Sequence, residues 1–246
     1  MAGDPGFGVR LRGLLDGRRL DAGVVCRRAD VDGSELSEVF RGAAPGPDLL
    51  RRLAPALGLR TADLFVIAGV ALPDDLAPSG GRLRTGLPRV VRHAVALPRE
   101  QLDVVRRFAA SLPREDRTPP APGPPYERYP AGPGAVLMRM VRNRNLGRTA
   151  TAQTFLLVTG RYWSAATYGM VGAGRVELTP ELLIDFSAVL GVPAGDLAAL
   201  SGVTLPDGLA APDPAATGVA ELIWDVRRLT TGQLEQVADL AASLRR

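Results

Sequence analysis

The sequence predicts an all-α fold made of two tandem copies of one helical unit, and self-comparison carries this prediction. Residues Pro47 to Pro78 match Pro180 to Pro212 in order and nearly without gaps, and Leu97 to Leu112 match Leu229 to Leu244. Apolar residues recur with helical spacing in these blocks. The segment from Ser111 to Gly134 is dense in proline, which interrupts helical hydrogen bonding. We therefore expect a first repeat over residues 1–112, a linker over 113–133 and a second repeat over 134–246.

Composition restricts the class of protein. The chain has 246 residues, of which 46% are hydrophobic, so it can bury substantial cores. All 30 basic residues are arginine and the net charge is +4, which is compatible with a polyanionic partner and also with a compositional bias of the genome. The single cysteine, Cys26, excludes an internal disulfide and a cysteine-based zinc site. Without a signal peptide or a membrane-length apolar run, the sequence predicts a cytoplasmic protein with no membrane partner.

A helix-turn-helix pattern lies in the first copy, from Leu20 to Gly42. Asp32 is placed to cap the start of the second helix of this motif, and Gly42 is placed to end it. The spacing of apolar or small residues suits two short helices packed across a tight turn. These residues are Val25, Cys26, Ala29, Val31, Leu36 and Val39.

This segment resembles the XRE (Cro/repressor-type) helix-turn-helix family. Ala29-Asp30-Val31 resembles the family's Ala-Gly-Val turn, with Asp30 at the usual glycine position. The family's first, fourth and fifth helices match Leu11 to Leu20, Pro47 to Leu59 and Thr61 to Phe65. The resemblance implies two tandem lambda-repressor-like helix-turn-helix domains, each followed by additional helices, in a bacterial transcription regulator associated with the nucleoid.

The second copy departs from the pattern at its helix-turn-helix motif. Leu137 to Leu146 aligns with the first helix, and Leu156 to Gly169 aligns with the turn and the second helix. The alignment needs one extra residue before the turn. It superposes Gly160, Ser164 and Gly169 on Gly33, Ser37 and Gly42, and it predicts that Trp163 takes the inward position of Leu36.

Double-stranded DNA is the partner that the resemblance implies, with the second helix of each motif in the major groove. Glu35 and Glu38 would repel phosphates in the first copy, whereas Arg161 favours the second copy as the main contact. The DNA-binding residues expected in the second copy are Arg161, Tyr162, Ser164, Tyr168, Arg139, Arg142, Arg144 and Arg148. Those expected in the first copy are Ser34, Ser37, Glu38 and Arg41.

The trailing helical segments suggest how the copies assemble. We expect either an internal pseudo-dimer of the two repeats or a homodimer built on it. An alternative is a degenerate helix-turn-helix scaffold that acts in protein–protein interaction or small-ligand sensing without binding DNA. The sequence has no phosphate-binding loop, no dinucleotide-binding motif after a strand and no histidine pair. It therefore predicts a non-enzyme with no cofactor and no metal.

Overall fold

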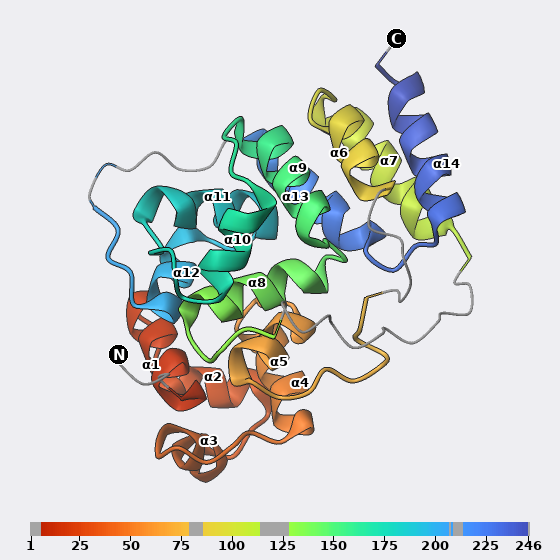
Figure 1. The fold of residues 1–246 in the computed structure, drawn as a ribbon. Coiled ribbons are helices and arrows are strands. Elements are labelled where there is room, and N and C mark those ends of the chain that lie inside the picture. Colours follow the sequence, from red (N-terminus) through yellow and green to blue (C-terminus); the bar gives the residue numbers. More distant parts are fainter. Residues whose placement is uncertain (1–5, 79–85, 114–127, 207, 209–213, 246) are drawn as a thin grey trace.

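The structure, a computed structural model, describes residues 6–78, 86–113, 128–206, 208 and 214–245. All regular secondary structure in these ranges is helical, which confirms the all-α class (Figure 1). The first half contains α1 (Phe7–Gly17), α2 (Ala22–Ala29), α3 (Gly33–Phe40), α4 (Pro47–Ala56), α5 (Thr61–Ala68), α6 (Gly86–Ala94) and α7 (Arg99–Ser111). The second contains α8 (Pro133–Asn143), α9 (Arg148–Thr159), α10 (Ala165–Gly172), α11 (Pro180–Leu190), α12 (Ala194–Ser201), α13 (Pro214–Val226) and α14 (Thr231–Ser243). Most of the expected linker, residues 114–127, lies outside the described residues.

The helix-turn-helix pattern of the first copy forms α2, a short turn and α3. The Asp32 side chain accepts a hydrogen bond from the Ser34 amide at the start of α3, as the sequence predicts. Asp30 ends α2 in the left-handed region, with φ 52° and ψ 52°. Aspartate tolerates this conformation better than most residues, so this turn does not require a glycine. Cys26 is buried, as expected for a core position.

The two five-helix units, α1–α5 and α8–α12, share the same internal packing. In each unit the first helix packs on the third, the second on the fourth, and the fourth on the fifth. A close approach is also repeated. A β-carbon added to Gly8 would lie 2.2 Å from the Val39 carbonyl oxygen, and one added to Gly134 would lie 2.0 Å from the Val171 carbonyl oxygen. The duplication therefore extends to individual backbone contacts.

These contacts correct the expected alignment of the second helix-turn-helix motif. Ser164 caps the start of α10, so it corresponds to Asp32 and not to Ser37. Tyr168 is 1% exposed and takes the buried place of Leu36. The expectation that Trp163 is a core residue is wrong, because it precedes the cap of α10 and is 39% exposed.

The two halves pair with each other within one chain. Helix α1 packs on α12, and its counterpart α8 packs on α5. Arg18 of the first half donates to Asp196 at the α1–α12 junction, and Arg144 of the second half donates to Asp63 at the α8–α5 junction. Arg18 and Arg144 occupy the same place after their helices, as Asp63 and Asp196 do within theirs. The same ion pair is thus made twice, once in each direction, as in a dimer with a pseudo-two-fold axis.

Each of these arginines also donates to a carbonyl oxygen of its own half. Arg18 Nη1 lies 2.5 Å from the Leu57 oxygen, and Arg144 Nη2 lies 2.7 Å from the Leu190 oxygen. Both oxygens belong to the end of the fourth helix of their unit. Each guanidinium therefore joins three helices, two from its own half and one from the other.

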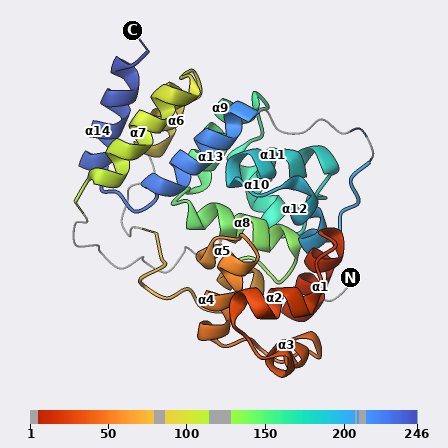
Figure 2. The same ribbon diagram turned by 180° about the vertical axis from the view of Figure 1, so that it is seen from behind.

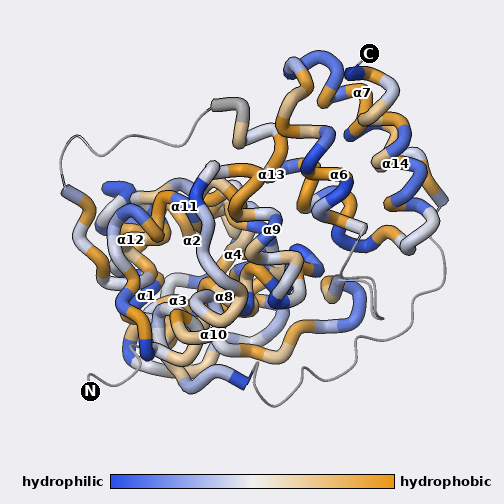
Figure 3. Tube along the Cα trace, turned by 45° about the horizontal axis from the view of Figure 1, so that its top comes forward, coloured by the Kyte–Doolittle hydropathy of each residue, from blue (hydrophilic) through white to orange (hydrophobic). Residues whose placement is uncertain are grey.

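The trailing helices exchange partners in the same way. Helix α6 packs on α14, and α7 packs on α13 (Figure 2). A β-carbon on Gly86 would meet the Leu234 side chain at 3.2 Å, and one on Gly218 would meet the Leu102 side chain at 2.6 Å. Hydrophobic and hydrophilic stretches alternate along α6, α7 and α14, so each helix buries one face and exposes another (Figure 3).

The four trailing helices break the symmetry because they rest on the second half. Helix α6 packs on α9, and α13 packs on α11. Trp224 of α13 reaches the α8–α5 junction, where its ring faces the guanidinium groups of Arg227 at 3.9 Å, Arg60 at 4.5 Å and Arg144 at 5.2 Å. Burial lowers the pKa of Arg60 and of Arg227 to about 10. The aromatic face offsets part of the cost of burying these cations.

Candidate nucleic-acid interface

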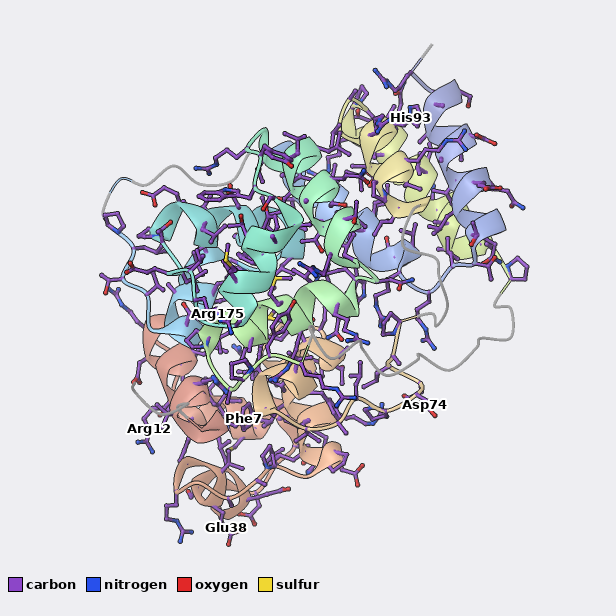
Figure 4. All side chains as sticks on the ribbon, in the orientation of Figure 1. Phe7, Arg12, Glu38, Asp74, His93 and Arg175 are labelled. Carbon is purple, nitrogen blue, oxygen red and sulfur yellow. The ribbon has the colours of Figure 1, made fainter. Side chains whose placement is uncertain are left out.

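Helix α3 projects from the end of the molecule opposite the trailing helices (Figures 1 and 2). It packs against α1 and α2, through Leu36 and Val39 on its inner side. The remaining positions of its outer face are accessible, and Glu38 lies at this tip of the molecule (Figure 4). The exposed residues on this face are Ser34, Ser37, Glu38 and Arg41. All four expected contacts of the first copy are therefore presented to solvent together.

The acidic character of α3 is partly neutralised within the first copy. Arg52 Nη2 lies 3.1 Å from a Glu35 carboxylate oxygen, and Arg52 Nη1 donates to the Asp30 carbonyl oxygen at 2.6 Å. Backbone and side-chain hydrogen bonds from Ser34 hold the pKa of Asp32 below its usual value. Glu38 is thus the carboxylate that projects from the outer face without an ion pair among the described residues.

Exposed arginines lie on the two helices that pack against α3. Arg27 and Arg28 lie in the last turn of α2. The Arg27 guanidinium folds back along α2, within 3.6 Å of the position that a β-carbon would take on Gly23. Arg12 of α1 stacks over the ring of Phe40, with 5.1 Å between the guanidinium carbon and the ring centroid. These side chains form a basic margin beside α3 that could contact phosphates.

The second copy presents a different surface. Helix α10 carries no charged side chain. Arg161, in the turn before it, forms an ion pair of 2.7 Å with Asp185 of α11, whose side chain is 2% exposed. Burial raises the pKa of Asp185, and the Arg161 charge only partly opposes that shift. Arg161 therefore compensates a buried carboxylate inside its own copy.

Two of the expected DNA contacts lie in the interior, which corrects their predicted exposure. Tyr168 packs against Phe155 and Phe186, with ring centroids 4.6 Å and 6.2 Å away. Burial raises the pKa of Tyr168, and its hydroxyl has no hydrogen-bond partner among the described residues. Arg144 is fully buried in its pair with Asp63. Neither side chain can reach a nucleic acid without unfolding of its surroundings.

The other arginines expected from the second copy are half-buried. Arg139 and Arg142 on α8 and Arg148 at the start of α9 line a hollow of about 300 Å³ together with Arg128. Arg148 also lies beside Gly169 of α10, 3.7 Å from the position of an added β-carbon. Ser164 is half-buried, and its hydroxyl accepts the hydrogen bond from the Thr167 amide that caps α10.

Apolar side chains occupy the exposed positions near the second turn. Tyr162 is 70% exposed, Met170 40%, and Trp163 and Leu156 39% each. The two equivalent motifs therefore offer unlike surfaces: the first is polar with a basic margin, and the second is largely apolar, with the Arg161 side chain 48% exposed beside it.

Sequence reasoning missed the pairing of Arg18 with Asp196 and of Arg161 with Asp185. A signal for the first pair existed, because Arg18 matches Arg144 and Asp196 matches Asp63 in the internal alignment. No such signal existed for the second pair, because the residue that matches Asp185 in the first copy is Arg52.

Within the described ranges, no group of three histidine, cysteine, aspartate or glutamate side chains is placed to hold a metal ion. None of the helices in these ranges is long and apolar enough to cross a membrane. Comparisons of the chain with protein-family models, with curated proteins and with solved structures found no match.

Proposed function

We propose that the chain is a DNA-binding transcription regulator of the XRE type, with α3 as its main reading helix. The observation that carries the proposal is the exposed outer face of α3. Asp32 caps the start of this helix, and the neighbouring helix α2 carries exposed arginines. A helix that stands out from the body, with short polar side chains on its outer face, suits entry into a major groove.

The chemistry of this face favours a selective contact. The hydroxyl groups of Ser34 and Ser37 can donate to or accept from several base edges, and the Glu38 carboxylate accepts from a cytosine amino group. Arg41, Arg27 and Arg28 supply positive charge for phosphates at the margin. A carboxylate near the phosphates weakens non-specific binding, so sequence preference would exceed general affinity.

The second motif would contribute differently. Its exposed methyl and thioether groups, Ala166 and Met170, suit apolar contact with thymine methyl groups. The two ion pairs between the halves, Arg18 with Asp196 and Arg144 with Asp63, would fix the position of one motif relative to the other. A single chain would therefore cover two unlike half-sites.

The test is selection of genomic DNA fragments by the purified chain, followed by sequencing, at two salt concentrations. Glu38→Ala should relax the preferred base at one position by about 1–3 kcal/mol of discrimination. Arg28→Ala should keep the motif and reduce the slope of log affinity against log salt by about one. Arg161→Ala, made together with Asp185→Asn so that no buried carboxylate loses its counter-charge, is the matched control and should enrich the same motif as the wild type. Loss of the motif with this double variant would instead assign reading to the second copy.

A second candidate function, docking of another protein, is favoured by the exposed apolar side chains around the second turn. If the wild type enriches no motif at either salt concentration, this function replaces the first. Trp163→Ser and Met170→Ser should then reduce capture of the partner, whereas Glu38→Ala should not.

A further inference from the structure

The two junctions between the halves are equivalent in architecture, but α1 and α8 differ in sequence at most positions, and three of these differences change the charge or size of the side chain at the junction. Helices α1 and α8 both have 11 residues and match without a gap. At the α1–α12 junction, Gly13 and Gly17 allow close packing, since added β-carbons would lie 3.2 Å and 3.5 Å from atoms of Ala199. At the α8–α5 junction the corresponding residues are Arg139 and Asn143. The third difference places Arg142 where α1 has Asp16.

A groove accompanies these substitutions. Beside the α8–α5 junction lies a hollow of about 570 Å³, lined by Arg139 and Arg142 on one side. The opposite side is an apolar wall from the end of α5 and the segment after it, and it includes Val66, Val70 and Leu72. Pairing of the halves does not require arginine here, because glycine and aspartate serve at the other junction.

A second hollow, of about 300 Å³, shares Arg139 and Arg142 as lining residues, which indicates that the two hollows are parts of one groove. This second part adds Arg128 and Arg148, with Tyr129 and Leu146. Every charged side chain among the described residues that line either part is an arginine. The groove therefore has one apolar part and one cationic part, joined at Arg139 and Arg142.

Arg139 and Arg128 are the arginines of the groove expected to attract an anion, because Arg142 and Arg148 already take part in other interactions. Arg139 Nη2 donates to the Tyr129 carbonyl oxygen at 3.0 Å, which holds the guanidinium between the two parts. A guanidinium has five donor hydrogens in a planar fork, so this contact leaves donors that can bind a carboxylate or a phosphate.

We propose that this groove binds a small amphipathic anion. Its apolar body lies against the wall formed by Val66, Val70 and Leu72, and its carboxylate or phosphate group lies at Arg139 and Arg128. The volume of the apolar part is within the usual range for small-molecule sites, which are mostly apolar with a few placed polar groups. Such a ligand touches α5 of one half and α8 of the other, so it stabilises the junction that Arg144 and Asp63 form.

Titration calorimetry on the full chain tests this site without reference to DNA. The probes are decanoate and decyl phosphate. Decyltrimethylammonium, which has the same apolar chain but a positive charge, is the control for charge, and inorganic phosphate, which has no apolar chain, is the control for the apolar body. We expect saturable binding of one molecule of decanoate or decyl phosphate per chain, and binding of both controls weaker by about tenfold or more. A preference for decanoate or for decyl phosphate identifies the headgroup.

Arg139→Gln keeps an unbranched side chain of high helix propensity but is shorter and removes the charge, and it should weaken binding by about tenfold or more. Leu72→Ser should weaken decanoate binding by shortening the apolar wall. Arg89→Ala, on the distant helix α6, is the control variant and should bind like the wild type. Far-UV circular dichroism on heating shows whether each variant is folded.

The proposal is overturned if neither anionic probe binds, if decyltrimethylammonium or inorganic phosphate binds as tightly as they do, or if folded Arg139→Gln binds unchanged. These results are independent of the DNA selection experiment. If that experiment enriches no motif, the proposal that the groove binds an anion is unaffected.

Discussion

Arg144 and Asp63 form a bidentate ion pair buried between the two halves of the chain. Arg144 Nη1 lies 2.6 Å from Oδ1 of Asp63, Nη2 lies 2.8 Å from Oδ2, and the side chains are 0% and 1% exposed. The equivalent pair of Arg18 and Asp196 is less enclosed, since the Arg18 side chain is 22% exposed. The same type of arginine–aspartate pair thus occurs once fully buried and once partly exposed to water. Comparing the two pairs tests how much burial contributes to the cost of breaking such a pair.

Asp63→Asn should destabilise the protein by about 3–5 kcal/mol, because it leaves the buried Arg144 guanidinium without a counter-charge. Asp196→Asn should cost less, because water reaches Arg18. Urea denaturation at pH 7 measures both free energies of unfolding. Arg51→Ala, which breaks the exposed pair with Asp75, serves as the control and should leave stability unchanged. Equal losses for the two asparagine variants would contradict the role assigned to burial.

Asp185→Asn should stabilise the protein at pH 7 by about 1 kcal/mol, because it removes a desolvated charge and leaves Arg161 exposed to water. The pKa of Asp185 is raised in the folded state, so its contribution to stability is full below the unfolded pKa and is lost as pH rises through the folded pKa. The difference in unfolding free energy between variant and wild type should therefore grow from pH 3 to pH 7. A difference that is constant with pH would show that Asp185 titrates like an exposed carboxyl group.

Gly134→Ala and Gly8→Ala should each destabilise the protein by about 1–3 kcal/mol. The new methyl group would lie 2.0 Å or 2.2 Å from a carbonyl oxygen, so the first helix of the unit must move away from the third. Gly195→Ala, in α12, is the matched control. It meets no atom within 4 Å, and it should stabilise the protein by about 0.5–1 kcal/mol through the better helix propensity of alanine. Thermal unfolding of the three variants checks the order, and a loss in the control would refute the steric explanation.

Tyr168→Phe should leave stability unchanged or raise it by about 1 kcal/mol, because the buried hydroxyl has no partner among the described residues. Tyr168→Ala should cost about 3–5 kcal/mol, since it empties the cluster with Phe155 and Phe186. Chemical denaturation measures both. The phenylalanine variant should also select the same DNA as the wild type, and a lost motif would place the hydroxyl at the interface instead.

The sequence by itself determined the elements that depend on local patterns. Apolar periodicity and internal repetition indicated the helices of both copies and the trailing pairs, and Asp32 marked the start of α3. The same reasoning failed at α10. There the alignment of the two copies relied on identical glycine and serine residues. The correct alignment is instead defined by the buried residue, Tyr168, and by the residue that caps the helix, Ser164.

Only the tertiary structure decided which charged residues are available for binding. Arg144 and Arg161 are the type of residue expected on a DNA-binding surface. Each of them, however, pairs with a carboxylate from another helix: Arg144 with Asp63, and Arg161 with Asp185. No local pattern reveals such a pair, because its partners are distant in sequence and meet only when the helices pack. Burial then determines the outcome, since a carboxylate removed from water requires a counter-charge. Arg144, which is fully buried in this role, cannot reach a phosphate, and the charge of the exposed Arg161 is already shared with Asp185.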